Sequence, residues 1–132
     1  LLGYKLFNSG IVKKGKMLGR RLGFPTANIE IIENSCLKNG VYITNTYIEG
    51  KVYNSVSNVG YNPTVENNKR NIETFIFDFD GDLYGKEIKI EFLEFIREEK
   101  RFPSVEELKI RVNKDIDVAK KYFLNMNVYK LV

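Results

Sequence analysis

Hydrophobic and polar residues alternate with a period of about two along most of the chain, up to about residue 96. Segments 41–48 and 51–59 are rich in tyrosine and β-branched residues, which favour strands. The Glu49-Gly50 step between them is suited to a two-residue hairpin turn. The pattern therefore predicts a β-hairpin in this part of the chain.

Two further strands are predicted after this hairpin. Segment 72–79 alternates regularly and is expected to place Glu73 on one face with three phenylalanines, namely Phe75, Phe77 and Phe79. The Asp80-Gly81-Asp82 sequence ends this segment. Alternation resumes at Ile88 and loses its phase near Leu93, which predicts a β-bulge there.

A single helix is predicted near the end of the chain. Ser104 and Glu107 have the spacing of a capping box, and apolar residues then recur at intervals of three or four up to Phe123. We expect this amphipathic helix to end near Leu124. Short antiparallel strands followed by one helix favour a mostly β fold, in which a small closed six-stranded Greek-key antiparallel barrel has the C-terminal α-helix packed on it. We expect residues 1–132 to form one domain.

Composition limits the chemistry that this chain can perform. Its 132 residues suffice for one hydrophobic core without disulfides or a structural metal, and Cys36 is the only cysteine. Histidine is absent, so no mechanism can use an imidazole base. The net charge of +4 is compatible with binding a polyanionic nucleotide. No signal peptide or long apolar segment is seen, so we expect a cytoplasmic protein that does not bind a membrane.

The segment from Gly15 to Asn28 suggests a magnesium–nucleotide site. Its glycines could bring backbone amides close to phosphate oxygens, and its arginines and lysines supply positive charge. Thr26 and Asn28 follow Pro25 and would lie on the same side of an extended segment. Their side-chain oxygens are suitable ligands for Mg²⁺, which usually takes only one or two ligands from the protein.

The order of motifs along nearly the whole chain resembles that of the riboflavin kinases. The matching stretches are Gly-Arg-Arg-Leu-Gly-Phe-Pro-Thr-Ala-Asn at 19–28, Asn-Val-Gly-Tyr-Asn-Pro-Thr at 58–64, Glu-Thr-Phe-Ile at 73–76, Asp-Leu-Tyr-Gly-Lys at 82–86 and the segment 92–102. The resemblance implies ATP-dependent phosphorylation of the ribityl 5′-hydroxyl of riboflavin to give FMN and ADP, with Mg²⁺ as cofactor and ATP as co-substrate.

The same resemblance implies a role for particular residues. It makes Glu73 the general base, and Thr26 and Asn28 the metal ligands. The expected ATP-binding residues are Gly15, Gly19, Arg20, Arg21, Gly23, Thr26 and Asn28, and the expected flavin-binding residues are Asn62, Arg97, Lys100 and Phe102.

The resemblance also concerns the N-terminal residues and two positions at which this chain departs from the family pattern. Residues 1–4 are similar to the junction that follows the adenylyltransferase domain of bacterial bifunctional FAD synthetases, so an upstream domain of that kind is an expected partner. Phe75 stands where many riboflavin kinases have histidine, and Lys14 stands where another histidine is often found.

Alternative interpretations remain open from the residues alone. Thr26 and Asn28 could cap a turn, and Glu73 could be a solvated residue at the start of a strand. Two other functions compete with catalysis: a flavin-binding relic without turnover, and a β-barrel module that binds nucleic acid. We expect no nucleic-acid partner.

Overall fold

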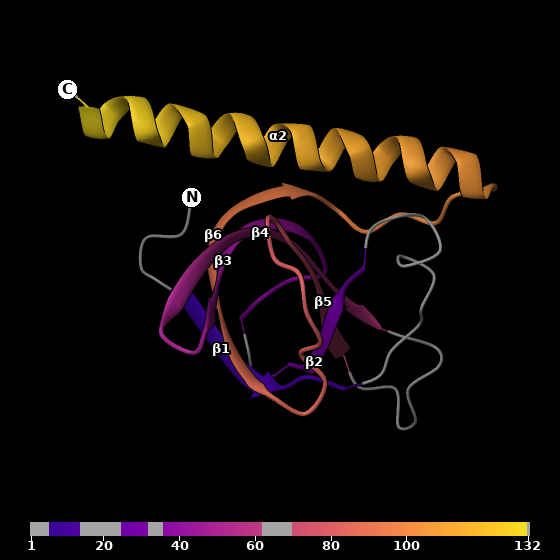
Figure 1. Cartoon of the computed structure of the whole chain (residues 1–132). Coiled ribbons are helices and arrows are strands. Elements are labelled where there is room, and N and C mark those ends of the chain that lie inside the picture. The colour runs from indigo at the N-terminus through magenta and orange to yellow at the C-terminus, as the bar shows by residue number, and fades with distance from the viewer. Residues whose placement is uncertain (1–5, 14–24, 32–35, 62–69, 132) are drawn as a thin grey trace. The chain divides into compact units, whose positions relative to one another are not determined.

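The computed structural model describes residues 6–13, 25–31, 36–61 and 70–131 (Figure 1). Contacts within the chain divide it into two compact units, residues 1–99 and residues 100–132. The first unit contains all the described strands, and the second contains the described helix. The packing of the helix on the barrel, and the single domain that would follow from it, stay predictions.

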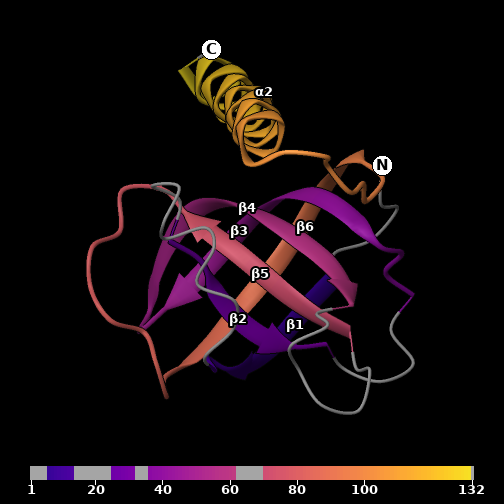
Figure 2. The ribbon, with the colours of Figure 1, turned by 90° about the vertical axis from the view of Figure 1, so that its right-hand side faces the viewer.

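Six antiparallel strands form one sheet that curls into a nearly closed barrel (Figure 2). The strands are β1 (Leu6–Ile11), β2 (Ala27–Glu30), β3 (Gly40–Ile48), β4 (Lys51–Tyr61), β5 (Arg70–Ile76) and β6 (Glu87–Arg97). Their order in the sheet is β1-β6-β3-β4-β5-β2. Because β6 returns to lie beside β3, strands β3 to β6 form a Greek key. The predicted fold class is confirmed in these respects.

The predicted hairpin joins β3 to β4. Glu49 and Gly50 have backbone φ angles of 49° and 81°. Positive φ at both central residues is the condition for a type I′ turn, whose twist matches that of the flanking strands. The register then runs without a break from the Ile48–Lys51 pair to the Gly40–Val59 pair.

The predicted bulge is also present, on β6. Thr44 pairs with Phe92 and Ile43 pairs with Glu94, so Leu93 has no partner on β3. A residue without a partner on the neighbouring strand is the defining feature of a bulge, and it bends the strand that contains it.

The prediction for the segment 72–79 was wrong at its C-terminal end. β5 ends at Ile76, and Phe77 and Asp78 form a turn in which Asp78 has a φ of 56°. The ring of Phe79 packs edge-on against Tyr53, with ring centroids 5.2 Å apart. Phe77 and Phe79 therefore do not continue the face of β5 that contains Glu73.

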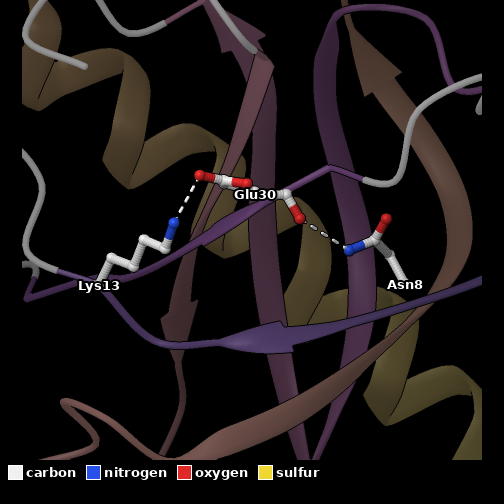
Figure 3. Close-up of polar contacts among 3 residues, drawn as sticks. All are labelled: Asn8, Lys13 and Glu30. Atoms are coloured by element: carbon white, nitrogen blue, oxygen red, sulfur yellow. Dashed lines mark hydrogen bonds and ion pairs between the residues drawn. The ribbon is translucent and has the colours of Figure 1, made fainter. Parts of the chain in front are cut away.

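The gap between β1 and β2 is bridged by a few polar contacts (Figure 3). The amide of Lys13 donates a hydrogen bond of 2.7 Å to the carbonyl of Asn28. The ammonium group of Lys13 pairs with the carboxylate of Glu30, and the side-chain amide of Asn8 donates to the Glu30 carbonyl at 3.2 Å. These contacts hold the edge strand β2 against β1 and against Lys13, which follows it.

The barrel interior is only partly apolar. Its hydrophobic core includes Ile29, Val59, Ile72 and Ile90, which are completely buried. Beside this core, five buried hydroxyl groups form a continuous series of hydrogen bonds, which we call the hydroxyl chain: Thr46, Ser55, Thr44, Ser57 and Thr74. The four oxygen–oxygen distances lie between 2.7 and 2.8 Å. The hydroxyl chain links β3, β4 and β5 through side chains as well as through the backbone.

The second unit contains the helix α2 (Val105–Leu131). The backbone amide of Glu107 donates to the Ser104 hydroxyl at 3.2 Å, which confirms Ser104 as the N-cap. The predicted end near Leu124 was wrong, because no glycine or proline follows that residue to stop the helix. The described residues contain no helix that is both long and apolar enough to pass through a membrane.

Candidate active site

Asn28 and Glu73 lie directly opposite each other on neighbouring strands. Asn28 is in β2 and Glu73 is in β5, and the antiparallel register pairs them. Directly opposite residues point to the same face of a sheet, with Cβ atoms typically about 4.5–5.5 Å apart. The fold therefore brings the expected metal ligand next to the expected general base, although the two are far apart in the sequence.

This pair projects away from the interior of the barrel. Ile29 and Ile72, which form the adjacent pair in the register, are completely buried in the core. Because successive side chains of a strand alternate between its two faces, Asn28 and Glu73 point outward. Glu73 is half-buried. A ligand could thus reach its carboxylate without entering the barrel.

Asn28 has a fixed backbone and an unsatisfied amide oxygen. The residue is 3% exposed, and its backbone is held by β5 on one side and by the Lys13 amide on the other. Its Oδ1 atom is buried and has no hydrogen-bond partner among the residues that the structure describes. Leaving a buried acceptor unpaired costs about 1–3 kcal/mol. A bound cation or donor would remove that cost, so this atom fits the role of a metal ligand.

Thr26 lies just before β2 and is exposed. Its side chain is therefore accessible to solvent. Its position on the same side of the chain as Asn28, and its role as a second metal ligand, stay predictions.

A third residue of this site was not predicted. Asn58 of β4 is directly opposite Glu73 in the register, on the side away from Asn28. Asn28, Glu73 and Asn58 therefore form one line across β2, β5 and β4, which we call the Asn–Glu–Asn row. The Oδ1 atom of Asn58 is also buried without a hydrogen-bond partner in the described part of the chain. In the sequence, Asn58 begins the matching stretch 58–64, but no role was assigned to it.

The environment of Glu73 along its own strand contains one aromatic side chain on the same face. Phe75 is half-buried, and its ring packs edge-on against Phe77 with centroids 5.6 Å apart. The expected succession of three phenylalanines on this face is not present, because the strand ends before Phe77.

The predicted flavin-binding residues are distributed over both units. Arg97 is the last residue of β6, and its guanidinium group donates to the Glu98 carbonyl at 3.1 Å. Arg97 pairs with Val41, which itself pairs with Asn58, so the Asn–Glu–Asn row continues across the sheet to Arg97. In the second unit, the ammonium group of Lys100 lies 5.9 Å from the centroid of the Phe102 ring.

Two glycines allow the end of β6 to pack closely on its neighbours. A Cβ atom at Gly60 would lie 2.1 Å from a carboxylate oxygen of Glu99. A Cβ atom at Gly40 would lie 2.5 Å from the Arg97 carbonyl oxygen and 2.4 Å from the Phe95 ring. The segment that follows Arg97 therefore lies directly on the end of β4, beside the Asn–Glu–Asn row.

Several predicted ligand residues lie outside the described part of the chain. These residues are Gly15, Gly19, Arg20, Arg21, Gly23 and Asn62. Their roles in binding ATP or flavin stay predictions.

Comparison with known proteins decides the family. The family model described as riboflavin kinase matches residues 2–123. The chain belongs to the riboflavin kinase family. A bifunctional riboflavin kinase/FMN adenylyltransferase of Bacillus subtilis is 41% identical over 131 residues, which cover 96% of this chain and 41% of that protein. An RNA-binding riboflavin kinase of the same organism is 44% identical over 116 residues, covering 87% of this chain and 50% of the relative.

A solved structure supports the fold of this riboflavin kinase family member. The riboflavin kinase of Trypanosoma brucei aligns with a TM-score of 0.64 and 23% sequence identity, covering 93% of this chain and 83% of that one. The chain spans about half of the length, or less, of the two Bacillus relatives. The family resemblance seen in the sequence motifs is thus confirmed.

Proposed function

We propose that this chain transfers the γ-phosphoryl group of ATP to the 5′-hydroxyl of riboflavin, giving FMN and ADP. The observation that carries the proposal is the pairing of Asn28 with Glu73 on the outer face of the barrel. The family match supplies the substrates, and the pairing supplies a carboxylate next to an unsatisfied amide oxygen.

Glu73 would act as the general base. Its carboxylate accepts the proton of the 5′-hydroxyl while the hydroxyl oxygen forms a bond to the γ-phosphorus, and the bond from that phosphorus to the bridging oxygen of ADP breaks. Phosphoryl transfer requires mainly alignment and stabilisation of charge, so a well-positioned carboxylate is sufficient on the acceptor side. The chain contains no histidine that could take this role.

Thr26 and Asn28 would hold Mg²⁺ on the nucleotide side of this carboxylate. The unsatisfied Oδ1 of Asn28 and the exposed hydroxyl of Thr26 are both suited to a hard cation. When bound, the ion would neutralise charge on the ATP phosphates. Lys13 is already paired with Glu30, so this lysine is engaged in joining β1 to β2.

The proposal is tested by incubating the chain with riboflavin, ATP and MgCl₂ and separating the flavins by chromatography. Formation of FMN that depends on ATP is the expected result. Riboflavin binding without FMN formation would instead support a relic that has lost turnover. RNA binding that weakens steeply with salt, in a protein that does not phosphorylate riboflavin, would support the nucleic-acid module.

The metal ligands are tested by a matched pair of substitutions at Thr26. Thr26→Ser keeps the hydroxyl, whereas Thr26→Val removes it and keeps the branched shape. Because Thr26 is exposed, neither change should affect folding. We expect Thr26→Val, but not Thr26→Ser, to raise the Mg²⁺ concentration needed for half-maximal FMN formation by about tenfold. Equal Mg²⁺ dependence of the two variants would remove Thr26 from the metal site.

A further inference from the structure

Asn58 occupies a position that strand pairing alone does not require to be polar. It pairs with Glu73 on one side and with Val41 on the other, and all three side chains share the outer face of the sheet. The preceding pair on the same face of β4 and β5 is Val56 with Phe75, which is apolar. Asn58 is thus an amide placed between a carboxylate and hydrophobic side chains.

The amide orientation follows from what these neighbours can offer. The side chain of Val41 has no hydrogen-bonding group, and an ionised Glu73 can only accept hydrogen bonds. The Nδ2 group of Asn58 can therefore donate to the Glu73 carboxylate, but neither neighbour in the row can donate to Oδ1. The Oδ1 atom is in fact buried and without a hydrogen-bond partner among the described residues. This oxygen needs a donor from outside the row.

We propose that Asn58 is a positioning residue that aligns both the general base and the substrate. With the flavin bound, its Nδ2 group would donate to the Glu73 carboxylate and hold that side chain in one rotamer. Its Oδ1 atom accepts a hydrogen bond from the ribityl 4′-hydroxyl, which is next to the reacting 5′-hydroxyl. The inference rests on the proposed function, because it assigns a partner to the site that carries out phosphoryl transfer.

The geometry of the ribityl chain makes the 4′-hydroxyl the suitable donor. Glu73 must contact the 5′-hydroxyl, and its neighbour Asn58 lies one strand away, at a spacing of about 4.8 Å. Two hydroxyls on adjacent carbons can span side chains at such a spacing, so one residue can hold each of them. Asn28 lies on the opposite side of Glu73, where the nucleotide is expected. Across three neighbouring strands, Asn28 would thus bind the metal, Glu73 would act as the base, and Asn58 would bind the ribityl chain.

The test combines a substitution with a change of substrate. Steady-state kinetics are measured for the wild type and Asn58→Ala, each with riboflavin and with 4′-deoxyriboflavin. We expect either change alone to lower kcat/KM for the flavin by at least tenfold. Asn58→Ala with 4′-deoxyriboflavin should be little worse than Asn58→Ala with riboflavin, because the substitution has already removed the hydrogen bond that the modified substrate lacks. The KM for ATP should remain unchanged.

Asn54→Ala provides the control. Asn54 is an exposed asparagine four residues away on the same strand and face, so its loss should affect neither substrate. The inference is overturned if the reductions in kcat/KM caused by Asn58→Ala and by the 4′-deoxy substrate multiply when the two are combined. It is also overturned if Asn58→Ala leaves kcat/KM as high as Asn54→Ala does. Should Asn58→Ala not fold, a wild-type kcat/KM that is equal for riboflavin and 4′-deoxyriboflavin still overturns it. Absence of FMN formation by the wild type would instead remove the proposed function itself.

Discussion

The hydroxyl chain inside the barrel should contribute measurably to stability through its central member, Thr44. The Thr44 hydroxyl lies 2.7 Å from that of Ser55 and 2.8 Å from that of Ser57. Ser55 also donates to the Thr44 carbonyl at 3.1 Å. One assignment then uses every proton once, with Thr44 donating to Ser55 and Ser57 donating to Thr44. Each of the five hydroxyls is satisfied in this arrangement.

Thr44→Val preserves the shape of the side chain and removes both of these hydrogen bonds. A buried hydrogen bond contributes about 1 kcal/mol net, and a donor left without an acceptor costs about 1–3 kcal/mol. The added methyl group returns about 0.8 kcal/mol of burial. We therefore expect a loss of about 2 kcal/mol in the free energy of unfolding. With a urea m-value of about 2 kcal/mol/M, the midpoint of unfolding should fall by about 1 M.

Thr46→Val is the matched control. Thr46 is at the end of the hydroxyl chain, is equally buried, and makes one of the hydroxyl contacts, to Ser55 at 2.8 Å. Its loss should cost less than about 0.5 kcal/mol, because one hydrogen bond of about 1 kcal/mol is offset by about 0.8 kcal/mol of methyl burial and no donor is left unpaired. A Thr44→Val protein within about 0.5 kcal/mol of the wild type, or a Thr46→Val protein that is equally destabilised, would refute the reasoning.

Three further results are expected. Gly40→Ala should destabilise the fold by more than about 2 kcal/mol in urea unfolding, because its new methyl group would meet the Arg97 backbone. Gly60→Ala should cost less than about 1 kcal/mol, because only the flexible Glu99 side chain must move. Equal losses of stability in the two variants would contradict this. The pKa of Tyr47 is raised by its burial and by its hydrogen bond to Glu91. The stabilisation linked to this raised pKa is complete below about pH 10 and is lost as pH rises through the folded-state pKa, so Tyr47→Phe should lose stability less steeply above pH 10 than the wild type. Parallel stability curves above pH 10 would exclude Tyr47 as a contributor.

The parts of the fold that local signals determine could be predicted from the sequence. The Glu49-Gly50 turn needs positive φ angles that this pair provides, and the phase slip at Leu93 marked the bulge directly. The end of β5 could not be predicted, because Phe77 continues the alternation although the chain turns there. The short strand β2 has only four residues and is held by long-range contacts, such as that between Asn8 and Glu30.

The candidate site shows the same contrast between features that local sequence determines and features that depend on long-range strand pairing. Asn28 and Glu73 were predicted as functional residues from their motifs, but their pairing depends on the register of two strands far apart in the sequence. Asn58 was not assigned a role, because its position opposite Glu73 is visible only once β4 and β5 are aligned. Sequence motifs thus predicted the chemistry, and the strand register shows which of the side chains concerned lie opposite one another.

The most direct test of the proposed mechanism is the rate of FMN formation by Glu73→Gln at saturating riboflavin, ATP and Mg²⁺. Glutamine keeps the size of the side chain but cannot accept the proton of the 5′-hydroxyl. We expect kcat to fall by about 10²–10⁴-fold, the range typical of a lost general base, while the affinity for ATP stays within about twofold of the wild type. A Glu73→Gln protein that forms FMN at the wild-type rate would contradict the central claim that this carboxylate, opposite Asn28, removes the proton.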